Sequence, residues 1–200
     1  MRVMTHFGLW CLGLAVAETQ TTESERDCLE RHATGKKRLV EIGVWHGVTT
    51  CRLRKAMHPE GELIGVDPYP KGRLGFSTQR FIAHREVSKI VNGNITWLRL
   101  TGVEAAKAYI ETGGEKVDFV FIDGDHSYEG LRGDWESWND LVLPFGIIAL
   151  HDSRSSSIRQ IDNVGSAIYT RQVILKDPGF EVVETVDSLT VLRKRDSSSD

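Results

Sequence analysis

The chain contains five short runs of mostly apolar residues, separated by stretches whose composition suits helices. Runs of this kind are typical of β-strands, and we predict strands at residues 38–42, 62–67, 95–100, 117–122 and 146–150. Because strands and helices alternate, the strands should be parallel neighbours in one sheet. Their nearly continuous apolar character indicates that helices cover both faces of that sheet.

The alternation ends near the C-terminus, where FEVVETVDSLTVLRK contains two strand-type runs joined at Asp187-Ser188. Such a pair predicts an antiparallel hairpin. The expected fold is therefore α/β: a Rossmann-like, doubly wound, seven-stranded sheet, mostly parallel with a C-terminal antiparallel hairpin. Two hundred residues suffice for one domain with a sizeable core. We place it at residues 37–195, between an N-terminal helical cap at 1–36 and a disordered tail at 196–200.

The N-terminal stretch MRVMTHFGLWCLGLAVAE is unusually apolar. It predicts a short buried helix with Phe7, Trp10, Cys11 and Leu14 on one face. The alternative is a signal peptide whose cleavage site would be the AVA at residues 15–17. A membrane span is excluded because it needs about 20 apolar residues.

A second amphipathic helix is predicted directly after the fourth strand. Apolar residues recur there at spacings of three and four, which is the pattern of a helix packed on a sheet. The residues that form this face are Tyr128, Leu131, Trp135, Trp138 and Val142. We interpret the two tryptophans as core residues and not as a substrate cage.

Chemically reactive residues follow four of the five predicted strands. In sheets of this type, ligands bind beyond the carboxyl ends of the strands. We therefore expect the polar residues at those ends to meet around one crevice, which would also keep their charges out of the core. They are Glu41 with Gly43, then Asp67, then Asp123, and finally His151 with Asp152.

The first strand leads into the turn EIGVWHGVTT, in which Gly43 and Gly47 precede a helix predicted at 48–57. Glycine allows a tight strand-to-helix turn that passes close to a ligand. A carboxylate at the end of the next strand, here Asp67, can accept both hydroxyls of a ribose. Together these features favour an adenosine-bearing ligand. The alternatives are a helix simply packed on its strand and an Asp67 that only shapes the turn before Pro68.

Four segments carry a resemblance to a known family: EIGVWHG, LIGVDPY, FVFIDGDHSYEG and GIIALHDS. They resemble class I S-adenosylmethionine (SAM)-dependent methyltransferases over roughly residues 38–152, which would make 37–195 a methyltransferase domain. More narrowly, they resemble small-molecule O-methyltransferases with a DGDH motif, relatives of the metal-dependent catechol and macrolide-sugar enzymes. The resemblance implies a cofactor site that holds SAM. Its residues would be Glu41, Gly43, Gly47 and Thr49 at the methionine and ribose, Asp67 at the ribose hydroxyls, Thr101 and Gly102 at the adenine, and Asp123.

The same resemblance implies a divalent metal, because the metal-dependent relatives hold magnesium with carboxylates at the positions of Asp123 and Asp152. We name Asp123, Asp152 and His151 as the expected ligands of Mg²⁺. The third ligand departs from the family pattern, since Ser153 and His151 flank Asp152, and Asp125 or His126 could replace it. Two ionised carboxylates at neighbouring strand ends repel each other, so the alternatives to a metal are a shared proton and a cationic side chain, with Arg154 nearest to Asp152 in sequence.

A hydroxyl acceptor must lose its proton before it can take a methyl group. His126 is the candidate base, with Asp123 beside it as the second catalytic residue, because an imidazole with a pKa near 6.5 suits proton transfer at neutral pH. The alternative is a His126 that hydrogen-bonds backbone and shapes the turn after the fourth strand.

Composition narrows the class of protein further. A formal net charge of -3 argues against nucleic-acid binding by bulk electrostatics. The cysteines, Cys11, Cys28 and Cys51, have no paired spacing and indicate reduced thiols in a cytoplasmic protein. We therefore predict a cytoplasmic SAM-dependent O-methyltransferase acting on a small hydroxylated molecule, a natural product or sugar. The alternatives are an NAD-dependent oxidoreductase, against which the missing G-x-G-x-x-G counts, and a non-catalytic nucleoside-binding module.

Overall fold

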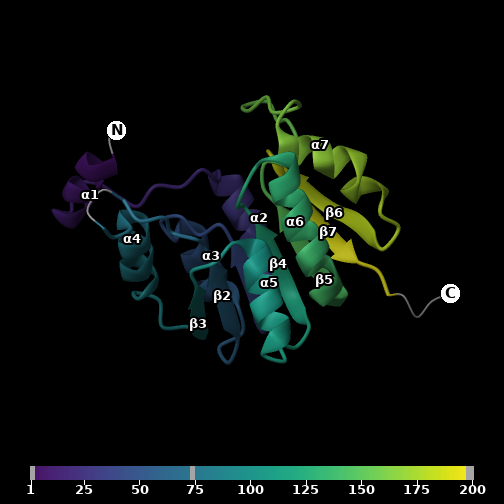
Figure 1. The fold of residues 1–200 in the computed structure, drawn as a ribbon, viewed down its shortest axis with the longest axis horizontal. Helices are drawn as coiled ribbons and strands as arrows, with labels where there is room; N and C mark the ends of the chain where they lie inside the picture. Colours follow the sequence, from purple (N-terminus) through teal and green to yellow (C-terminus); the bar gives the residue numbers. More distant parts are fainter. Residues whose placement is uncertain (1–2, 73–74, 197–200) are drawn as a thin grey trace.

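The structure is a computed structural model that describes residues 3–72 and 75–196. Its central element is a seven-stranded sheet in the order β3-β2-β1-β4-β5-β7-β6 (Figure 1). Of the predicted tail at 196–200, residues 197–200 lie outside the described residues. The strands are β1 (Arg38–Ile42), β2 (Glu62–Val66), β3 (Asn94–Leu98), β4 (Val117–Ile122), β5 (Val142–Leu150), β6 (Phe180–Val186) and β7 (Leu189–Lys194).

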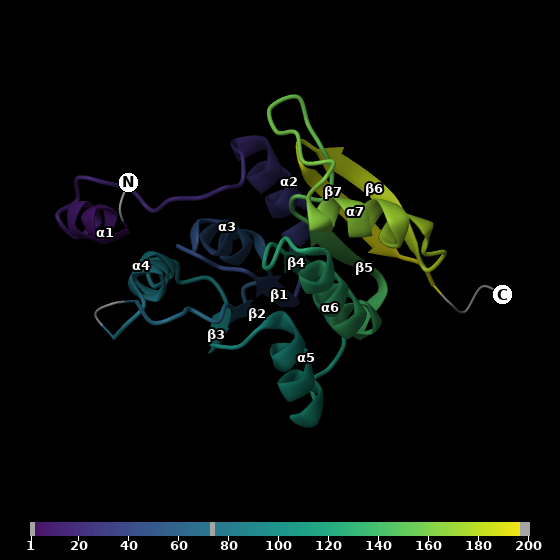
Figure 2. The same cartoon turned by 45° about the horizontal axis from the view of Figure 1, so that its top comes forward.

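Helices cover both faces of this sheet, as Figure 2 shows. Helices α5, α6 and α7 pack on one face, and α2 and α3 pack on the other, with α4 near the β3 edge. The helices are α1 (Val3–Cys11), α2 (Glu23–Ala33), α3 (Val48–Ala56), α4 (Thr78–Val87), α5 (Gly102–Glu111), α6 (Tyr128–Trp138) and α7 (Gly165–Gln172), with short 3₁₀ turns η1 (Asn139–Leu141) and η2 (Ile174–Lys176).

The sequence prediction of the fold is confirmed. Strands β1 to β5 run parallel, β7 pairs antiparallel with both β5 and β6, and the strand order reverses between β1 and β4. One detail was wrong. Val142, expected at the end of the amphipathic helix, is the first residue of β5, because α6 ends at Trp138 and η1 intervenes. Trp135 and Trp138 are core residues, as predicted, with exposures of 2% and 0%.

The N-terminal helix forms, but it is not the buried helix that its apolar face predicted. Of α1, only His6 is buried, whereas Cys11 and Leu14 are exposed. The helix lies beside α4 in both views, where Trp10 and Phe7 contact Phe81 (Figure 1). The reason is geometric: α1 meets one short helix, which offers too little surface to cover a whole apolar face. No helix within the described ranges is long and apolar enough to cross a bilayer.

Helix α2, also from the predicted cap, is bound to the sheet through a buried carboxylate. Glu25 is 1% exposed and accepts hydrogen bonds from the Ser188 backbone N–H (2.9 Å), the Ser188 hydroxyl (2.7 Å) and the Thr22 backbone N–H (2.8 Å). Its other close neighbour is the ring of His151, with Nε2 at 3.3 Å from Oε2. Despite burial, these donors lower the pKa of Glu25 to about 2. Glu25 therefore anchors α2 to the β6–β7 turn as a carboxylate. The domain boundary near residue 36 stays a prediction.

We predict that Glu25→Ala lowers the free energy of unfolding by about 3–5 kcal/mol, because it leaves a buried imidazolium and two buried donors without their partner. Urea denaturation followed by circular dichroism measures this change. Asp27→Ala is the matched control, since Asp27 lies on the same helix with an exposed side chain at 3.4 Å from Arg52. It should change the stability by less than about 1 kcal/mol. Equal losses in both variants would contradict the anchoring role of Glu25.

Candidate active site

The register of the parallel strands brings four of the predicted residues into one row. Ile42 pairs with Val66 on one side and with Ile122 on the other, and Ile122 pairs with Leu150. The next residue along each of these strands therefore lies at the same edge of the sheet. Those residues are Gly43, Asp67, Asp123 and His151. The strand register thus brings these four predicted strand-end residues to one edge of the sheet.

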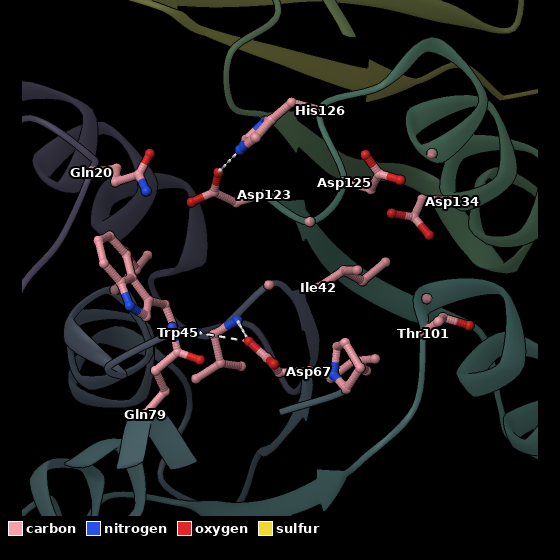
Figure 3. A pocket seen from close by; sticks show the side chains of 18 of the residues that line it. Gln20, Ile42, Trp45, Asp67, Gln79, Thr101, Asp123, Asp125, His126 and Asp134 are labelled. Carbon is pink, nitrogen blue, oxygen red and sulfur yellow. Dashed lines mark hydrogen bonds and ion pairs between the residues drawn. The ribbon is translucent and has the colours of Figure 1, made fainter. Parts of the chain in front are cut away.

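A cavity of about 700 Å³ opens above this row (Figure 3). Most of the predicted site residues line it: Gly43, Thr49, Asp67, Thr101, Gly102, Asp123 and His126. Glu41, Gly47, His151 and Asp152 lie outside its lining. The sequence analysis missed Trp45, Gln79 and Asp134, as well as Glu18, Thr19 and Gln20 from the segment before α2.

The turn that contains Gly43 packs closely against the C-terminal end of β4. Gly43 has a φ of +89°, and a Cβ at this position would lie 2.0 Å from the carbonyl oxygen of Asp123. No side chain fits there, so the closeness of β1 and β4 depends on glycine. Gly47 has a different function: a Cβ there would lie 2.9 Å from a methyl group of Val87, so this glycine lets α3 approach α4.

Asp67 is the cap of the glycine turn. Its Oδ2 accepts hydrogen bonds from the backbone N–H groups of Val44 (3.1 Å) and Trp45 (3.0 Å), and its Oδ1 accepts one from the N–H of Tyr69 (2.8 Å) (Figure 3). A carboxylate has about four acceptor positions. Three are therefore used by the protein, and about one remains for a ligand hydroxyl. Both sequence interpretations of Asp67, turn residue and ligand residue, are compatible with this geometry.

Glu41 lies directly under the turn with 0% exposure, and neither of its carboxyl oxygens has a hydrogen-bond partner in the described chain. Burial, together with the nearby charges of Asp123 and Asp67, raises the pKa of Glu41 to about 8. A buried carboxyl group without a donor is costly. Glu41 thus provides an acidic group close beneath the cavity that a cationic ligand would stabilise.

Thr101 and Gly102 form the opposite wall, at the start of α5. The Thr101 hydroxyl accepts a hydrogen bond from the N–H of Glu104 at 3.3 Å, and the Glu104 carboxylate accepts one from the N–H of Thr101 at 2.9 Å. This capping box fixes the beginning of the helix. The Gly102 carbonyl oxygen accepts a hydrogen bond from Trp138 Nε1 at 2.9 Å, which joins α5 to α6.

Asp134 is the most informative residue that the sequence analysis missed. It is 5% exposed, it lines the cavity near Thr101, and burial, with the nearby charge of Asp125, raises its pKa to about 7 (Figure 3). The signal was present in the sequence. With Leu131 and Trp138, Asp134 follows the helical spacing of three and four, so a carboxylate occupies the otherwise apolar face of α6.

The acidic residues and histidines that follow β4 and β5 form ion pairs in the structure. His126 lies at the rim of the cavity, with Nδ1 at 3.6 Å from Asp152 Oδ2 and Nε2 at 4.0 Å from Asp123 Oδ1. Asp152 is 1% exposed, and its Oδ2 is 2.7 Å from the guanidinium of Arg159. The cationic partner is thus Arg159, whereas Arg154, the expected rival to a metal, is exposed.

His151 lies beneath this cluster, between two carboxylates. Its Nδ1 is 2.8 Å from Asp123 Oδ1, and its Nε2 is 3.3 Å from Glu25 Oε2. Burial alone would lower the pKa of His151, but the carboxylates of Asp123, Glu25 and Asp152 outweigh it and raise that pKa to about 10. His151 is therefore an imidazolium at neutral pH, and both ring nitrogens face acids.

These contacts do not fit the magnesium centre that the resemblance implied. A metal ligand must present a lone pair, whereas a protonated His151 has none to offer. The Asp152 carboxylate is already paired with the guanidinium of Arg159, at 2.7 Å from Oδ2. Within the described ranges, groups of three ligand atoms within 4.8 Å of one another occur elsewhere, at His6, Glu18 and His46 and at Cys28, His32 and Glu184.

Fold and cavity together define a Rossmann-like α/β protein with a nucleoside-type site at the reversal of strand order. A family model described as a methyltransferase domain matches residues 40–153, more than half of the chain. The chain belongs to this methyltransferase-domain family. This assignment argues against the NAD-dependent alternative.

Solved structures show the same fold. The cofactor-bound protein Rv0187 from MTB matches with a TM-score of 0.67 and 16% identity, covering 97% of this chain and 90% of that one. An O-methyltransferase from Bacillus cereus in complex with SAH (S-adenosylhomocysteine) has a TM-score of 0.65 and 16% identity, with coverages of 92% and 86%. An rRNA methylase from Streptococcus thermophilus matches with a TM-score of 0.60 and 12% identity, covering 90% of this chain and 100% of that one. Similar folds thus occur in an O-methyltransferase and in an rRNA methylase.

A curated relative is less informative. The uncharacterized protein y4gI of Sinorhizobium fredii (strain NBRC 101917 / NGR234) is 25% identical over 130 residues. That alignment covers 61% of this chain and 14% of the relative's length, so the chain spans only a small part of the relative that it matches.

We predict that Gly43→Ala destabilises the protein well beyond the usual cost of a positive φ and abolishes SAH binding, because the new methyl group would displace the mouth of β4. Gly35→Ala separates the two effects: Gly35 has a φ of +71° with nothing within 4 Å of its virtual Cβ. The control should lose only about 1–2 kcal/mol of stability and keep SAH affinity. Thermal unfolding and calorimetry measure both quantities, and a Gly43→Ala variant that behaves like the control would contradict the close packing.

Proposed function

We propose that this protein transfers the methyl group of SAM to a hydroxyl of a small molecule, and that His126 removes the hydroxyl proton. The observation that carries the proposal is the position of His126, at the rim of the cavity and between the carboxylates of Asp123 and Asp152. An imidazole in that setting can accept a proton, and the two anions stabilise the imidazolium that forms.

The lining of the cavity is compatible with SAM. Gly43 lets the turn after β1 pack against the end of β4 at the wall of the cavity, Asp67 has about one acceptor position left for a ribose hydroxyl, and Glu41 would provide an acidic group near the cationic methionine end. Thr101 and Gly102 would flank the adenine. When bound, SAM supplies an electrophilic methyl group on a sulfonium, whose transfer to oxygen leaves SAH and a methyl ether.

The chain's own residues then have three tasks. The wall of the cavity holds the acceptor oxygen in line with the methyl carbon, since displacement requires that alignment. Asp152, with Oδ2 at 3.6 Å from Nδ1, faces one side of the His126 ring, and the Nε2 lone pair would accept the hydroxyl proton. Asp123, at 4.0 Å from Nε2, faces the developing positive charge.

Magnesium, which the resemblance implied, is not needed to offset the acidic residues in this arrangement. The negative charge of Asp152 is balanced by Arg159, and that of Asp123 by the imidazolium of His151. Each of the two carboxylates beside His126 therefore has a cationic partner from the chain itself. We therefore propose a base-assisted methyl transfer in which His126 activates the acceptor hydroxyl.

The acceptor class is proposed from the size of the cavity and from the negative net charge of the chain. A cavity of about 700 Å³ must hold the cofactor, and the space left beside it suits a small molecule. A net charge of -3 provides no general attraction for a phosphate backbone. Because one of the proteins with a similar fold is an rRNA methylase, the test of the acceptor must also be able to detect methyl transfer to RNA.

We predict that His126→Asn lowers methyl transfer by about 10²–10⁴ while leaving SAH affinity within about twofold, because the amide cannot act as a base. The assay follows labelled methyl transfer from SAM to a panel of phenols, hydroxylated glycosides, amines and rRNA. Activity within a few-fold of wild type would make His126 a structural turn residue. Transfer confined to amines or rRNA would contradict the acceptor class, and an absence of SAH binding would contradict the function.

We further predict that methyl transfer is retained in excess EDTA and that Mg²⁺ does not raise the melting temperature of the protein. The reason is that Arg159 and His151 already neutralise the carboxylates that would bind the ion. Loss of activity in EDTA with recovery on addition of Mg²⁺ or Mn²⁺ would overturn this prediction. Arg159→Gln provides the complementary measurement: it removes the rival cation from Asp152 and should create a weak Mg²⁺ affinity detectable by calorimetry.

A further inference from the structure

A thiol, an imidazole and a carboxylate lie together between α2 and β6, outside the lining of the cavity. They belong to Cys28, His32 and Glu184, and one ligand atom of each lies within 4.8 Å of the other two. Cys28 is 0% exposed, whereas the side chains of His32 and Glu184 are 22% and 31% exposed. The group is therefore closed toward the core and open toward solvent, which gives an ion a path of entry.

Two of the three residues share one face of α2. Cys28 and His32 are four residues apart in this helix, so their side chains lie one turn apart on the same side. Two ligands at this spacing can bind the same zinc ion. The sequence analysis compared the cysteines only with one another and therefore did not detect a pair formed by a cysteine and a histidine.

Glu184 faces α2 because β6 contains an irregularity. Val182 pairs with Leu192 of β7, but Glu184 pairs with Val191, so one extra residue lies between the two pairs. Leu192 belongs to the core under α5, α6 and α7, whereas Val191 belongs to the core under α2 and α3. A shift by one residue turns a side chain to the other face of a sheet. The irregularity thus directs Glu184 toward α2.

The carboxylate of Glu184 has one oxygen on each side of the group. Its Oε2 is 2.8 Å from His32 Nε2, and its Oε1 is 2.5 Å from the guanidinium of Arg31. Carboxylates that bind metals are usually hydrogen-bonded to a further residue as well. Arg31 can therefore orient Glu184 while Oε2 faces an ion. Asp152 differs, because its second oxygen lies 3.6 Å from the imidazolium of His151.

A second group of ligand atoms, at His6, Glu18 and His46, is less suited to a metal. Burial and the neighbouring His6 lower the pKa of His46 to about 4, so its ring is neutral at pH 7. Its Nδ1 accepts a hydrogen bond from the Glu18 backbone N–H at 3.0 Å, which places the ring hydrogen on Nε2. Neither nitrogen of His46 then has a free lone pair. Among residues 3–72 and 75–196, none donates a hydrogen bond to the ring of His32, so its hydrogen can move to Nδ1 and free Nε2.

We propose that Cys28, His32 and Glu184 bind one Zn²⁺ ion that joins α2 to β6. Sulfur, nitrogen and oxygen ligands of this kind are the set that zinc accepts in a tetrahedral site, and water can fill the fourth position from the solvent side. A thiolate and an imidazole select zinc over magnesium, which prefers oxygen ligands. The site is separate from the cavity, so the inference goes beyond the proposed function.

Binding of the ion requires the loss of one proton from the thiol. In the metal-free chain, burial and the charge of Glu184 raise the pKa of Cys28 to about 12, so the thiol keeps its proton at pH 7. When zinc binds, the S–H bond breaks, a sulfur–zinc bond forms and the proton passes to the buffer. Calorimetry in two buffers of different ionisation enthalpy should therefore detect proton release.

The first experiment titrates the reduced, metal-free protein with Co²⁺, which replaces zinc and absorbs light. Wild type should bind one Co²⁺ per chain with the near-ultraviolet charge-transfer absorption of a thiolate ligand, and Zn²⁺ should abolish that absorption by displacing the cobalt. Cys28→Ala should not show it. Cys11→Ala is the control, because Cys11 is exposed and remote from the group, and it should keep the absorption.

A second variant tests the site without altering the core. Glu184→Gln should weaken Zn²⁺ binding about tenfold or more in calorimetry, since it replaces a charged ligand of the ion. The matched control is Glu181→Gln, because Glu181 lies on the same strand and also pairs with an arginine, Arg193, at 2.5 Å. This control should bind Zn²⁺ as wild type does. Zn²⁺, unlike Mg²⁺, should also raise the melting temperature of wild type.

Three results would overturn the inference: a wild type without thiolate-to-cobalt absorption, an absorption that persists in Cys28→Ala, or equal Zn²⁺ affinities in Glu184→Gln and Glu181→Gln. None of them affects the proposed function, because SAH binding by Glu184→Gln should stay within about twofold of wild type. A wild type that binds Zn²⁺ as expected but does not bind SAH would overturn the proposed function and leave the zinc site in place.

Discussion

The site depends on one close approach of backbone to backbone. At Gly43, the turn after β1 lies so near the Asp123 carbonyl oxygen that a Cβ would be 2.0 Å from it. Because these strands flank the reversal of strand order, this contact determines how far apart the two halves of the cavity stand. Asp67, at the end of β2, stabilises the turn by accepting hydrogen bonds from two backbone N–H groups of the turn. The polar side chains at the ends of the strands are positioned by this backbone contact and by the turn that Asp67 stabilises.

The strand ends also show how a protein keeps several acids together. His151, as an imidazolium, is shared by Asp123 and Glu25, and Arg159 pairs with Asp152. Such buried pairs contribute little net stability, since desolvation offsets their attraction. Their consequence is local: Asp123 and Asp152, the two acids beside His126, each have a cationic partner from the chain itself. The same pairs join α2 to the sheet, so docking of the N-terminal segment and the charge state of the site are coupled through Glu25.

Backbone strain is concentrated at the same edge of the sheet. Trp45, Tyr69 and Asp152 have φ values of 50°, 42° and 47°, and each follows the end of a parallel strand. Left-handed conformations in such residues are costly and persist where the surroundings enforce them. In this protein the surroundings are the Asp67 hydrogen bonds and the Asp152 ion pairs. The strain thus accompanies the residues that shape the cavity.

The amino-acid sequence by itself determined the sheet, its hairpin and the edge at which the site would form, because strand periodicity and the polarity of strand ends are local properties. It also identified Gly43, Asp67, Asp123 and His126 as neighbours, since parallel register places successive strand ends side by side. The sequence could not determine the partners of these residues. Glu25 is far from His151 along the chain, Arg159 and not Arg154 reaches Asp152, and Asp134 meets the cavity only because α6 docks against α5. Such pairings depend on the rotation and docking of helices, which only tertiary packing decides.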